Sequence, residues 1–258
     1  MCVLDTGSTD NSWELLQGYK GVYPNLIIDQ KIIIPWRFDY ARNASLELVP
    51  KDTDMYFMVD LDEIIKEDNW IDVVKNAWEP NFSRGVYAYH RNVDENDNIL
   101  RTINEFRIHS KRWHKYINIV HEALVDENGE KTFLMETCTP ILIAVWHYPK
   151  LNKKTNYLEL CEKDLEVYPN DAIMRLQLCI ECEIEEEFEK AKYHYNYLLE
   201  HDQDKIQWFE IARCYTGLGY INFHQGNIDL GLKYFSEGRI LYPLFSDNYL
   251  LAMEIYFN

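Results

Sequence analysis

The feature that most constrains the fold is a change of hydrophobic periodicity near Lys150. Before this residue, short apolar runs rich in β-branched and aromatic residues alternate with helical patterns, and after it only helical patterns remain. Alternating strands and helices favour an α/β domain, whereas helices alone favour an all-α domain. The sequence therefore predicts an α/β domain over residues 1–150, followed by an all-α domain over residues 151–258.

Six strands and three helices are expected in the first domain. The strands are predicted at Cys2–Leu4, Asn25–Asp29, Met55–Val59, Gly85–His90, Glu105–His109 and Leu142–His147, and the helices at Ser12–Lys20, Asp39–Leu48 and Asn69–Ala77. Their order predicts a mostly parallel sheet with flanking helices. The polar stretch Asn92–Ile99 is typical of a hairpin or loop, which makes the later part of the sheet mixed.

The second domain contains two 34-residue units, Ala172–Lys205 and Ala212–Phe245, with similar residues at equivalent places. Small and aromatic residues recur in both units, namely Leu178, Cys179, Ala191, Tyr195 and Leu198 in one and Leu218, Gly219, Gly231, Phe235 and Gly238 in the other. Asn156–Pro169 matches the second half of a preceding unit. This pattern resembles the tetratricopeptide repeat, which implies a short superhelix of stacked helix pairs. Glu186 replaces the usual turn glycine, and a generic helical bundle is the alternative.

The chain is strongly acidic, with 43 Asp and Glu against 26 Lys and Arg and a formal charge of −17. This charge disfavours binding to the phosphate backbone of a nucleic acid. No apolar run approaches the ~20 residues of a transmembrane segment, and the first residues lack the pattern of a signal peptide. The six cysteines are scattered, and Cys179 and Cys182 are expected to be buried thiols. We therefore expect a cytoplasmic protein, for which peripheral contact with a membrane stays open.

The stretch most informative about chemistry is Met55–Glu63, where an apolar run ends in acids. Residues i and i+2 of a strand point the same way, so Asp60 and Asp62 are expected to project together while Leu61 faces the opposite layer. Two neighbouring carboxylates repel each other unless a proton or a cation lies between them. Mg²⁺ or Mn²⁺ would satisfy both acids and leave coordination sites for diphosphate oxygens. By itself the motif is weak, because most D-x-D triplets are solvated turns.

Two further segments place polar residues beside predicted strands. Asp5 ends the first strand, and Gly7 and Ser8 follow it in a turn. The Asp5 carboxylate is suited to accept hydrogen bonds from a ribose or a base, or it simply closes the turn. The helix before the acidic strand adds three polar residues, Asp39, Arg42 and Asn43. Arg42 is suited to contact a diphosphate or sugar hydroxyls, although a salt bridge to an aspartate at the sheet end explains it nearly as well.

Taken in order, DTGSTD at residues 5–10, FDYARN at residues 38–43 and DLDE at residues 60–63 resemble the family 2 glycosyltransferases with the GT-A fold. They are similar in particular to a bacterial subgroup in which tetratricopeptide repeats follow the catalytic domain. The resemblance covers residues 1 to about 150. It implies a metal-dependent inverting transferase that moves a sugar from a nucleotide-diphosphate donor, such as a UDP-sugar, to a protein, peptide or glycan acceptor that the repeats can hold.

The resemblance also assigns residues to roles. Donor contacts fall to Asp5, Gly7, Ser8, Asp39, Arg42, Asn43 and Asp60. The metal, Mn²⁺ or Mg²⁺, falls to Asp60, Asp62 and His147. A neutral imidazole suits Mn²⁺, although a capped, partly buried histidine is equally expected at the end of the last strand.

The segment Arg112–Tyr116 followed by Val120–Glu122 is similar to the R-W and V-H-E stretches of the same subgroup. Inverting transfer needs a base that takes the acceptor proton, and a carboxylate near the sugar also stabilises oxocarbenium character. Glu122 is the first choice for that base, ahead of Asp62 and Glu63. The alternative is that His121 and Glu122 only orient a loop.

Met1 falls where the second strand of the family begins. Roughly forty residues, comparable with one strand–helix unit, are therefore expected to be missing at the N-terminus. That unit normally supplies a central strand and part of the nucleoside pocket. A mis-assigned start codon, an isolated fragment and a degenerate paralogue are the three explanations.

Two other functions stay open. A non-catalytic scaffold would use the repeats to recruit a peptide or protein and would keep the α/β part as a vestige. A metal-dependent phosphatase or nucleotidyltransferase would also use clustered acids at strand ends. Nucleotidyltransferases usually carry a Gly-rich basic phosphate loop early in the chain, and none is visible here.

Overall fold

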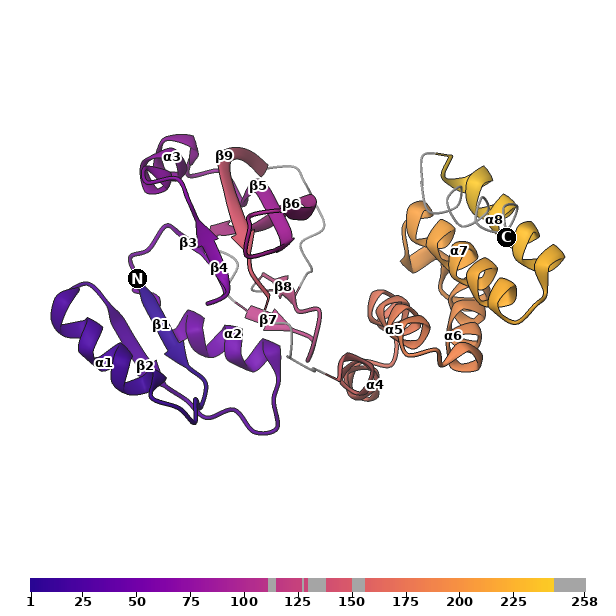
Figure 1. Cartoon of the computed structure of the whole chain (residues 1–258), viewed down its shortest axis with the longest axis horizontal. Coiled ribbons are helices and arrows are strands. Elements are labelled where there is room, and N and C mark those ends of the chain that lie inside the picture. Colours follow the sequence, from indigo (N-terminus) through magenta and orange to yellow (C-terminus); the bar gives the residue numbers. More distant parts are fainter. Residues whose placement is uncertain (111–114, 127, 130–137, 150–155, 244–258) are drawn as a thin grey trace. The chain divides into compact units, whose positions relative to one another are not determined.

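The computed structural model describes residues 1–110, 115–126, 128–129, 138–149 and 156–243. The chain forms two compact units (Figure 1). The α/β unit comprises Met1–Asn118 and Glu122–Lys154, and the helical unit comprises Ile119–His121 and Thr155–Asn258.

The α/β unit contains all six predicted strands and all three predicted helices, and β6 and β9 begin earlier than predicted. Three short strands, β4, β7 and β8, were not predicted, because three residues are too few to show a periodicity. The elements in chain order are β1 (Cys2–Asp5), α1 (Ser12–Val22), β2 (Ile27–Gln30), α2 (Phe38–Glu47), β3 (Met55–Phe57), β4 (Glu63–Ile65), α3 (Trp70–Ala77), β5 (Arg84–Val93), β6 (Ile99–Ser110), β7 (Lys115–Ile117), β8 (Ala123–Val125) and β9 (Cys138–His147).

The main sheet has five strands in the order β3-β6-β5-β9-β4. Only the β5–β9 pair is parallel, and the other three pairs are antiparallel. The prediction of a mostly parallel sheet is therefore wrong, whereas a mixed sheet with helices is confirmed. The reason is the long β5–β6 hairpin, which turns through the expected polar stretch Asn92–Ile99, and the antiparallel pairing of β3 and β4 at the two edges.

Two strands that are early in the chain, β1 and β3, each pair with another strand on one side only. β1 pairs with β2 in a separate parallel two-stranded sheet, and β3 pairs with β6 at the edge of the five-stranded sheet. Within the described residues, the other edge of β1 and the other edge of β3 pair with no strand. Both edges therefore present backbone groups that a further strand can pair with.

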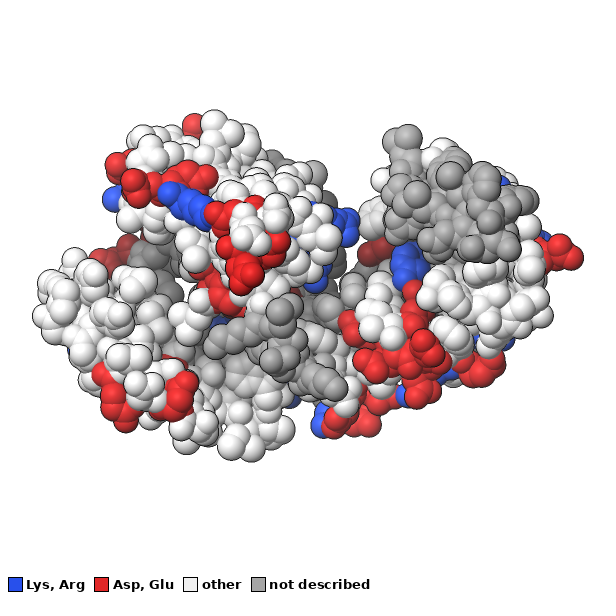
Figure 2. All heavy atoms as spheres, viewed as in Figure 1, with Lys and Arg blue, Asp and Glu red and all other residues white. Residues whose placement is uncertain are grey.

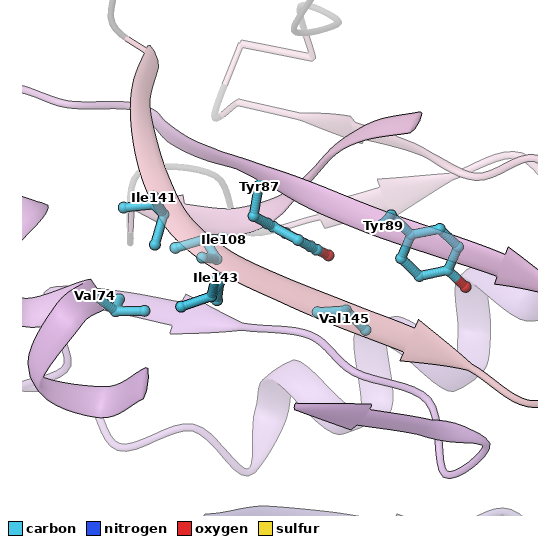
Figure 3. Packing of buried hydrophobic residues seen from close by; sticks show 7 residues of the cluster. All are labelled: Val74, Tyr87, Tyr89, Ile108, Ile141, Ile143 and Val145. Atoms are coloured by element: carbon cyan, nitrogen blue, oxygen red, sulfur yellow. The ribbon is translucent and has the colours of Figure 1, made fainter. Parts of the chain in front are cut away.

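The core of the α/β unit lies on one face of the five-stranded sheet, under α3. Its side chains come from α3, β5, β6 and β9 (Figure 3), and they are Val74, Tyr87, Tyr89, Ile108, Ile141, Ile143 and Val145. Alternate residues of β9 take part, whereas Leu142 between them is 87% exposed. This alternation shows that the two faces of the sheet have different environments.

The helical unit consists of α4 (Tyr157–Val167), α5 (Ala172–Ile184), α6 (Phe188–His201), a short 3₁₀ turn at Gln203–Lys205, α7 (Trp208–His224) and α8 (Ile228–Leu241). The predicted helical C-terminal stretch is thus confirmed. Consecutive helices pack on each other, and α5 also contacts α7 (Figure 1). Acidic side chains gather over α4, α5 and α6 on the face seen in Figure 2.

Helices α7 and α8 cross closely at two glycines. A Cβ atom on Gly219 would lie 2.7 Å from the ring of Phe235, and one on Gly231 would lie 3.0 Å from the carbonyl oxygen of Gly219. The equivalent residues of the α5–α6 pair, Cys179 and Ala191, are fully buried. Small side chains therefore set the distance between the paired helices.

Candidate functional site

The centre of the candidate site is Arg42, which α2 carries one turn from its start. The guanidinium Nη1 and Nη2 donate to the two carboxylate oxygens of Asp60, at 2.5 and 3.0 Å. Its Nε donates to Oε1 of Glu122 at 2.9 Å. One arginine thus joins the acid after β3 to the acid before β8.

Arg107 of β6 joins a third acid to the same group. Its Nη1 donates to Asp60 at 3.1 Å, and its Nη2 donates to Oε1 of Glu63. Glu63 is almost fully buried and also accepts hydrogen bonds from the Asp60 amide at 2.8 Å and the Tyr89 hydroxyl at 2.7 Å. We call these five residues, Arg42, Asp60, Glu63, Arg107 and Glu122, the arginine–carboxylate cluster.

The charges of the cluster stabilise one another. Burial by itself would raise the pKa of Asp60, but the hydrogen bonds and charge of Arg42, supplemented by Arg107, hold this pKa below its usual value. Burial also opposes the charge on both guanidinium groups, and their carboxylate partners more than offset it, so the pKa of Arg42 and of Arg107 is raised. Asp60 is therefore a carboxylate at neutral pH.

The backbone of the D-x-D motif is a turn rather than an extension of β3. The amide of Glu63 donates to the carbonyl oxygen of Asp60 at 3.1 Å, and the strand itself ends at Phe57. Leu61 is 92% exposed, so the prediction that it faces an opposite layer is wrong. The turn gives Asp60 and Asp62 different partners instead of the common direction that a strand would impose.

Asp62 lies beside His147, as the metal assignment requires. Oδ2 of Asp62 and Nε2 of His147 are 3.8 Å apart, and both side chains are partly exposed. The pairing of β4 with β9 produces this contact, because Glu63 is in register with His147. The imidazole stacks on Tyr89, and its Nδ1 is buried without a hydrogen-bond partner.

These two residues fit a divalent cation better than Asp60 does. A carboxylate oxygen and an imidazole nitrogen form a donor set that suits Mn²⁺, and such ions complete their shells with substrate phosphates and water. Asp60, in contrast, has both oxygens occupied by arginines. In the part of the chain that the structure describes, no group of three or more His, Cys, Asp or Glu side chains is arranged to hold a metal ion.

Asp5 is buried at the end of β1 and closes the turn that follows. Its Oδ1 accepts hydrogen bonds from the amides of Gly7 and Ser8, at 2.8 and 2.9 Å, and from the Gln30 side chain at 3.2 Å. Burial would raise the pKa of Asp5, but these hydrogen bonds lower it overall. Gly7 adopts a φ of 112°, a backbone conformation that residues other than glycine rarely adopt.

Asp39 and Asn43 bind neighbouring parts of the fold rather than the cluster. Asp39 is buried and accepts two hydrogen bonds from Arg37, at 3.0 and 2.9 Å. The Asn43 amide exchanges two hydrogen bonds with the backbone of Tyr116, at 2.8 and 2.7 Å, and so fixes α2 to β7. Asn43 therefore helps to hold α2, which carries Arg42, against β7.

Of the V-H-E stretch, only Glu122 takes part in the cluster. His121 belongs to the helical unit, where its Nε2 lies 3.6 Å from Glu181. Arg112, Trp113 and His114 lie outside the described residues. The sequence predictions missed Arg107 and Tyr89. The one signal for Arg107 was a charged residue between Phe106 and Ile108 in a predicted strand.

No protein-family model matches the chain. No curated protein shows significant sequence similarity to it either. Within the described residues, no helix has the length and apolar composition needed to cross a membrane.

Proposed function

We propose that the protein is a metal-dependent inverting glycosyltransferase of the cytoplasm that uses a nucleotide-diphosphate sugar, such as a UDP-sugar, as donor. One observation carries the proposal: the side chain of Arg42 binds both Asp60, from the D-x-D motif, and Glu122, from the V-H-E stretch. Residues that the family resemblance assigns to donor binding and to proton transfer thus lie in one cluster. The acceptor is a protein, peptide or glycan, and the helical unit, with tetratricopeptide-type repeats, is the candidate surface for holding it.

Asp62 and His147 would hold the Mn²⁺ or Mg²⁺ ion of such an enzyme. When bound, the ion neutralises charge on the diphosphate as the bond to the sugar breaks. Arg42 and Arg107 supply two further cations within the same turn region, where they already balance Asp60. Both guanidinium groups are suited to bind phosphate oxygens.

Glu122 is the group best placed to act as the base. Its carboxylate is partly exposed, whereas Glu63 is almost fully buried and bound by Arg107, Tyr89 and the backbone. Glu122 would take the proton of the acceptor nucleophile as that atom bonds to the anomeric carbon and the nucleoside diphosphate leaves. Arg42 orients the carboxylate through the hydrogen bond that its Nε donates to Oε1 of Glu122.

A non-catalytic scaffold is the second candidate, and one observation favours it. Both oxygens of Asp60 are occupied by arginines, which is the arrangement of a structural ion-pair cluster. In that case the helical unit would recruit a peptide and the α/β unit would not turn over a donor.

Binding of the nucleotide-sugar donor distinguishes the transferase from the scaffold. We expect isothermal titration to detect binding of UDP or a UDP-sugar that depends on Mn²⁺ and that Asp62→Asn and His147→Gln each weaken more than about tenfold. Glu122→Gln should retain this binding and lose sugar transfer or donor hydrolysis. Asp229→Asn, on an exposed position of α8, is the matched control and should behave as the unchanged protein. Binding that is absent, or that Asp62→Asn leaves intact, would contradict the transferase and favour the scaffold.

A further inference from the structure

A row of polar side chains crosses the five-stranded sheet on the face opposite its apolar core. Tyr56 of β3 is in register with His109 of β6, His109 with Arg84 of β5, and Arg84 with Cys138 of β9. Residues paired across strands lie on the same face of a sheet. The next residue after Arg84 is Gly85, and a Cβ atom there would meet the core residues Ile108 and Ile141. Since neighbours along a strand point to opposite faces, Arg84 points away from the core.

Three polar atoms, two in this row and one on β7 of a separate sheet, have no hydrogen-bond partner. They are Nε of Arg84, Nδ1 of His109 and the hydroxyl of Tyr116, and all three atoms are buried. His109 and Tyr116 are only 4% and 6% exposed. Folded proteins pair nearly all buried polar groups. Arg84 and His109 are cross-strand neighbours, so their two unpaired atoms point to a ligand that binds on this face.

The three groups are electrostatic neighbours. Burial lowers the pKa of His109 to about 3, and the charge of Arg84 contributes to this shift, so the imidazole is neutral. Burial raises the pKa of Tyr116 to about 12, and the charges of Arg42, Arg107 and Arg84 act against that shift. Tyr116 therefore keeps its proton and remains a donor at neutral pH.

The charged neighbours of Arg84 differ from those of Arg42 and Arg107. The charge of the Glu105 carboxylate acts on the pKa of Arg84, but no Asp or Glu among the residues described lies within the 4.0 Å of an ion pair with Arg84. Arg42 and Arg107, by comparison, are each bound to two carboxylates. A partly buried guanidinium without a paired carboxylate is unfavourable, and an anion that reaches it relieves that cost.

We propose that Arg84, His109 and Tyr116 form a binding site for an oxyanion, the phosphate or carboxylate group of a small ligand. The guanidinium supplies the charge and two parallel N–H donors, which match the geometry of both groups. The Tyr116 hydroxyl, and the Nδ1–H tautomer of His109, add neutral donors. None of these three residues belongs to the arginine–carboxylate cluster, although the charges of Arg42 and Arg107 act on Tyr116. The proposal does not depend on whether the chain transfers sugars.

The experiment follows the imidazole signals of His109 by NMR in the full chain during titration with inorganic phosphate and, separately, with acetate. Ionic strength is held constant with sodium chloride, and His109→Gln assigns the signals. We expect a saturable shift with at least one of the two anions, weakened more than about tenfold in Arg84→Met. Arg101→Gln removes an exposed arginine from the same sheet, and this control should bind as the unchanged protein does.

Thermal unfolding separates a ligand site from a structural role for Arg84. Methionine has a similar length and no charge, so Arg84→Met should unfold at the same or a higher temperature in the absence of phosphate and acetate. A phosphate response without an acetate response identifies a phosphate ligand, and the reverse identifies a carboxylate. No saturable shift with either anion, or equal shifts in the unchanged protein and Arg84→Met, would overturn the proposal.

Discussion

Arg42 holds both carboxylate oxygens of Asp60, at 2.5 and 3.0 Å, and so links helix α2 to the turn after strand β3. The arginine side chain is 17% exposed and the aspartate side chain is 42% exposed. The pair is therefore shielded on one side and solvated on the other. This intermediate burial determines how strongly each substitution here should act.

Arg42→Gln should lower the free energy of unfolding of the α/β unit by about 1–3 kcal/mol. Breaking a fully buried ion pair costs more than this, but solvent screens the exposed side of Asp60. The substitution also removes the cation that binds Glu122. Urea unfolding measures the change. Lys31→Gln, which breaks the exposed pair with Glu47, is the control and should change stability by less than about 0.5 kcal/mol.

The coupling between Arg42 and Asp60 should depend on pH. Because the folded-state pKa of Asp60 is lowered, its contribution to stability is fully present above the unfolded value of 3.8 and is lost as pH falls through the lower folded value. A double-mutant cycle with Arg42→Gln and Asp60→Asn should give a coupling of about 1 kcal/mol at neutral pH. That coupling should decline once the pH drops below about 4. A coupling of equal size at pH 7 and pH 3 would show that the pair is not ionic.

Local patterns predicted the elements of the α/β unit better than their arrangement. Periodicity placed β1, β2 and α2 within a few residues, because alternation and helical spacing are local properties. The strand order and the antiparallel edges depend on which distant segments pair, and no single segment encodes that. The prediction that Asp60 and Asp62 project together failed for a similar reason, since the strand ends at Phe57 and Asp60–Glu63 form a turn.

The candidate site was predicted in part. Asp62 and His147 do lie together, and Arg42 does reach an aspartate at the end of a strand, which was the structural alternative for it. Arg107 was missed because one arginine inside a strand gives no indication of which acids it will meet. Its partners are fixed only when β6 pairs with β3, a contact between segments far apart in the sequence.

Replacing Glu186 by glycine should stabilise the helical unit. It adopts a φ of 59° in the turn between α5 and α6, at the place where Gly226 adopts a φ of 80° between α7 and α8. Each turn contains an equivalent backbone hydrogen bond. The amide of Glu187 donates to the carbonyl oxygen of Cys182, and the amide of Asn227 donates to that of Asn222, both at 2.8 Å. A left-handed conformation costs a residue with a Cβ atom about 1 kcal/mol.

We therefore expect Glu186→Gly to raise the free energy of unfolding of the helical unit by up to about 1 kcal/mol, and Gly226→Ala to lower it by about 1 kcal/mol. Chemical denaturation followed by circular dichroism reports both. Glu185→Gly makes the same change of charge one residue earlier, where φ is −88°, and should bring no gain. A gain equal to that of Glu186→Gly would mean that charge, not conformation, is responsible.

The close approach of α7 and α8 should make Gly219 intolerant of a single methyl group. Alanine would place its Cβ atom 2.7 Å from the Phe235 ring and 3.1 Å from the carbonyl oxygen of Gly231, so the helices would have to move apart. Overpacking of this kind costs about 1–3 kcal/mol, and the loss should appear in the thermal unfolding of the helical unit. Gly18→Ala is the matched control, because nothing lies within 4 Å of the added atom on α1 and alanine favours a helix by about 0.5–1 kcal/mol. If both substitutions stabilise the protein, α7 and α8 do not cross at the glycines, and the small residues at that crossing do not set the helix spacing.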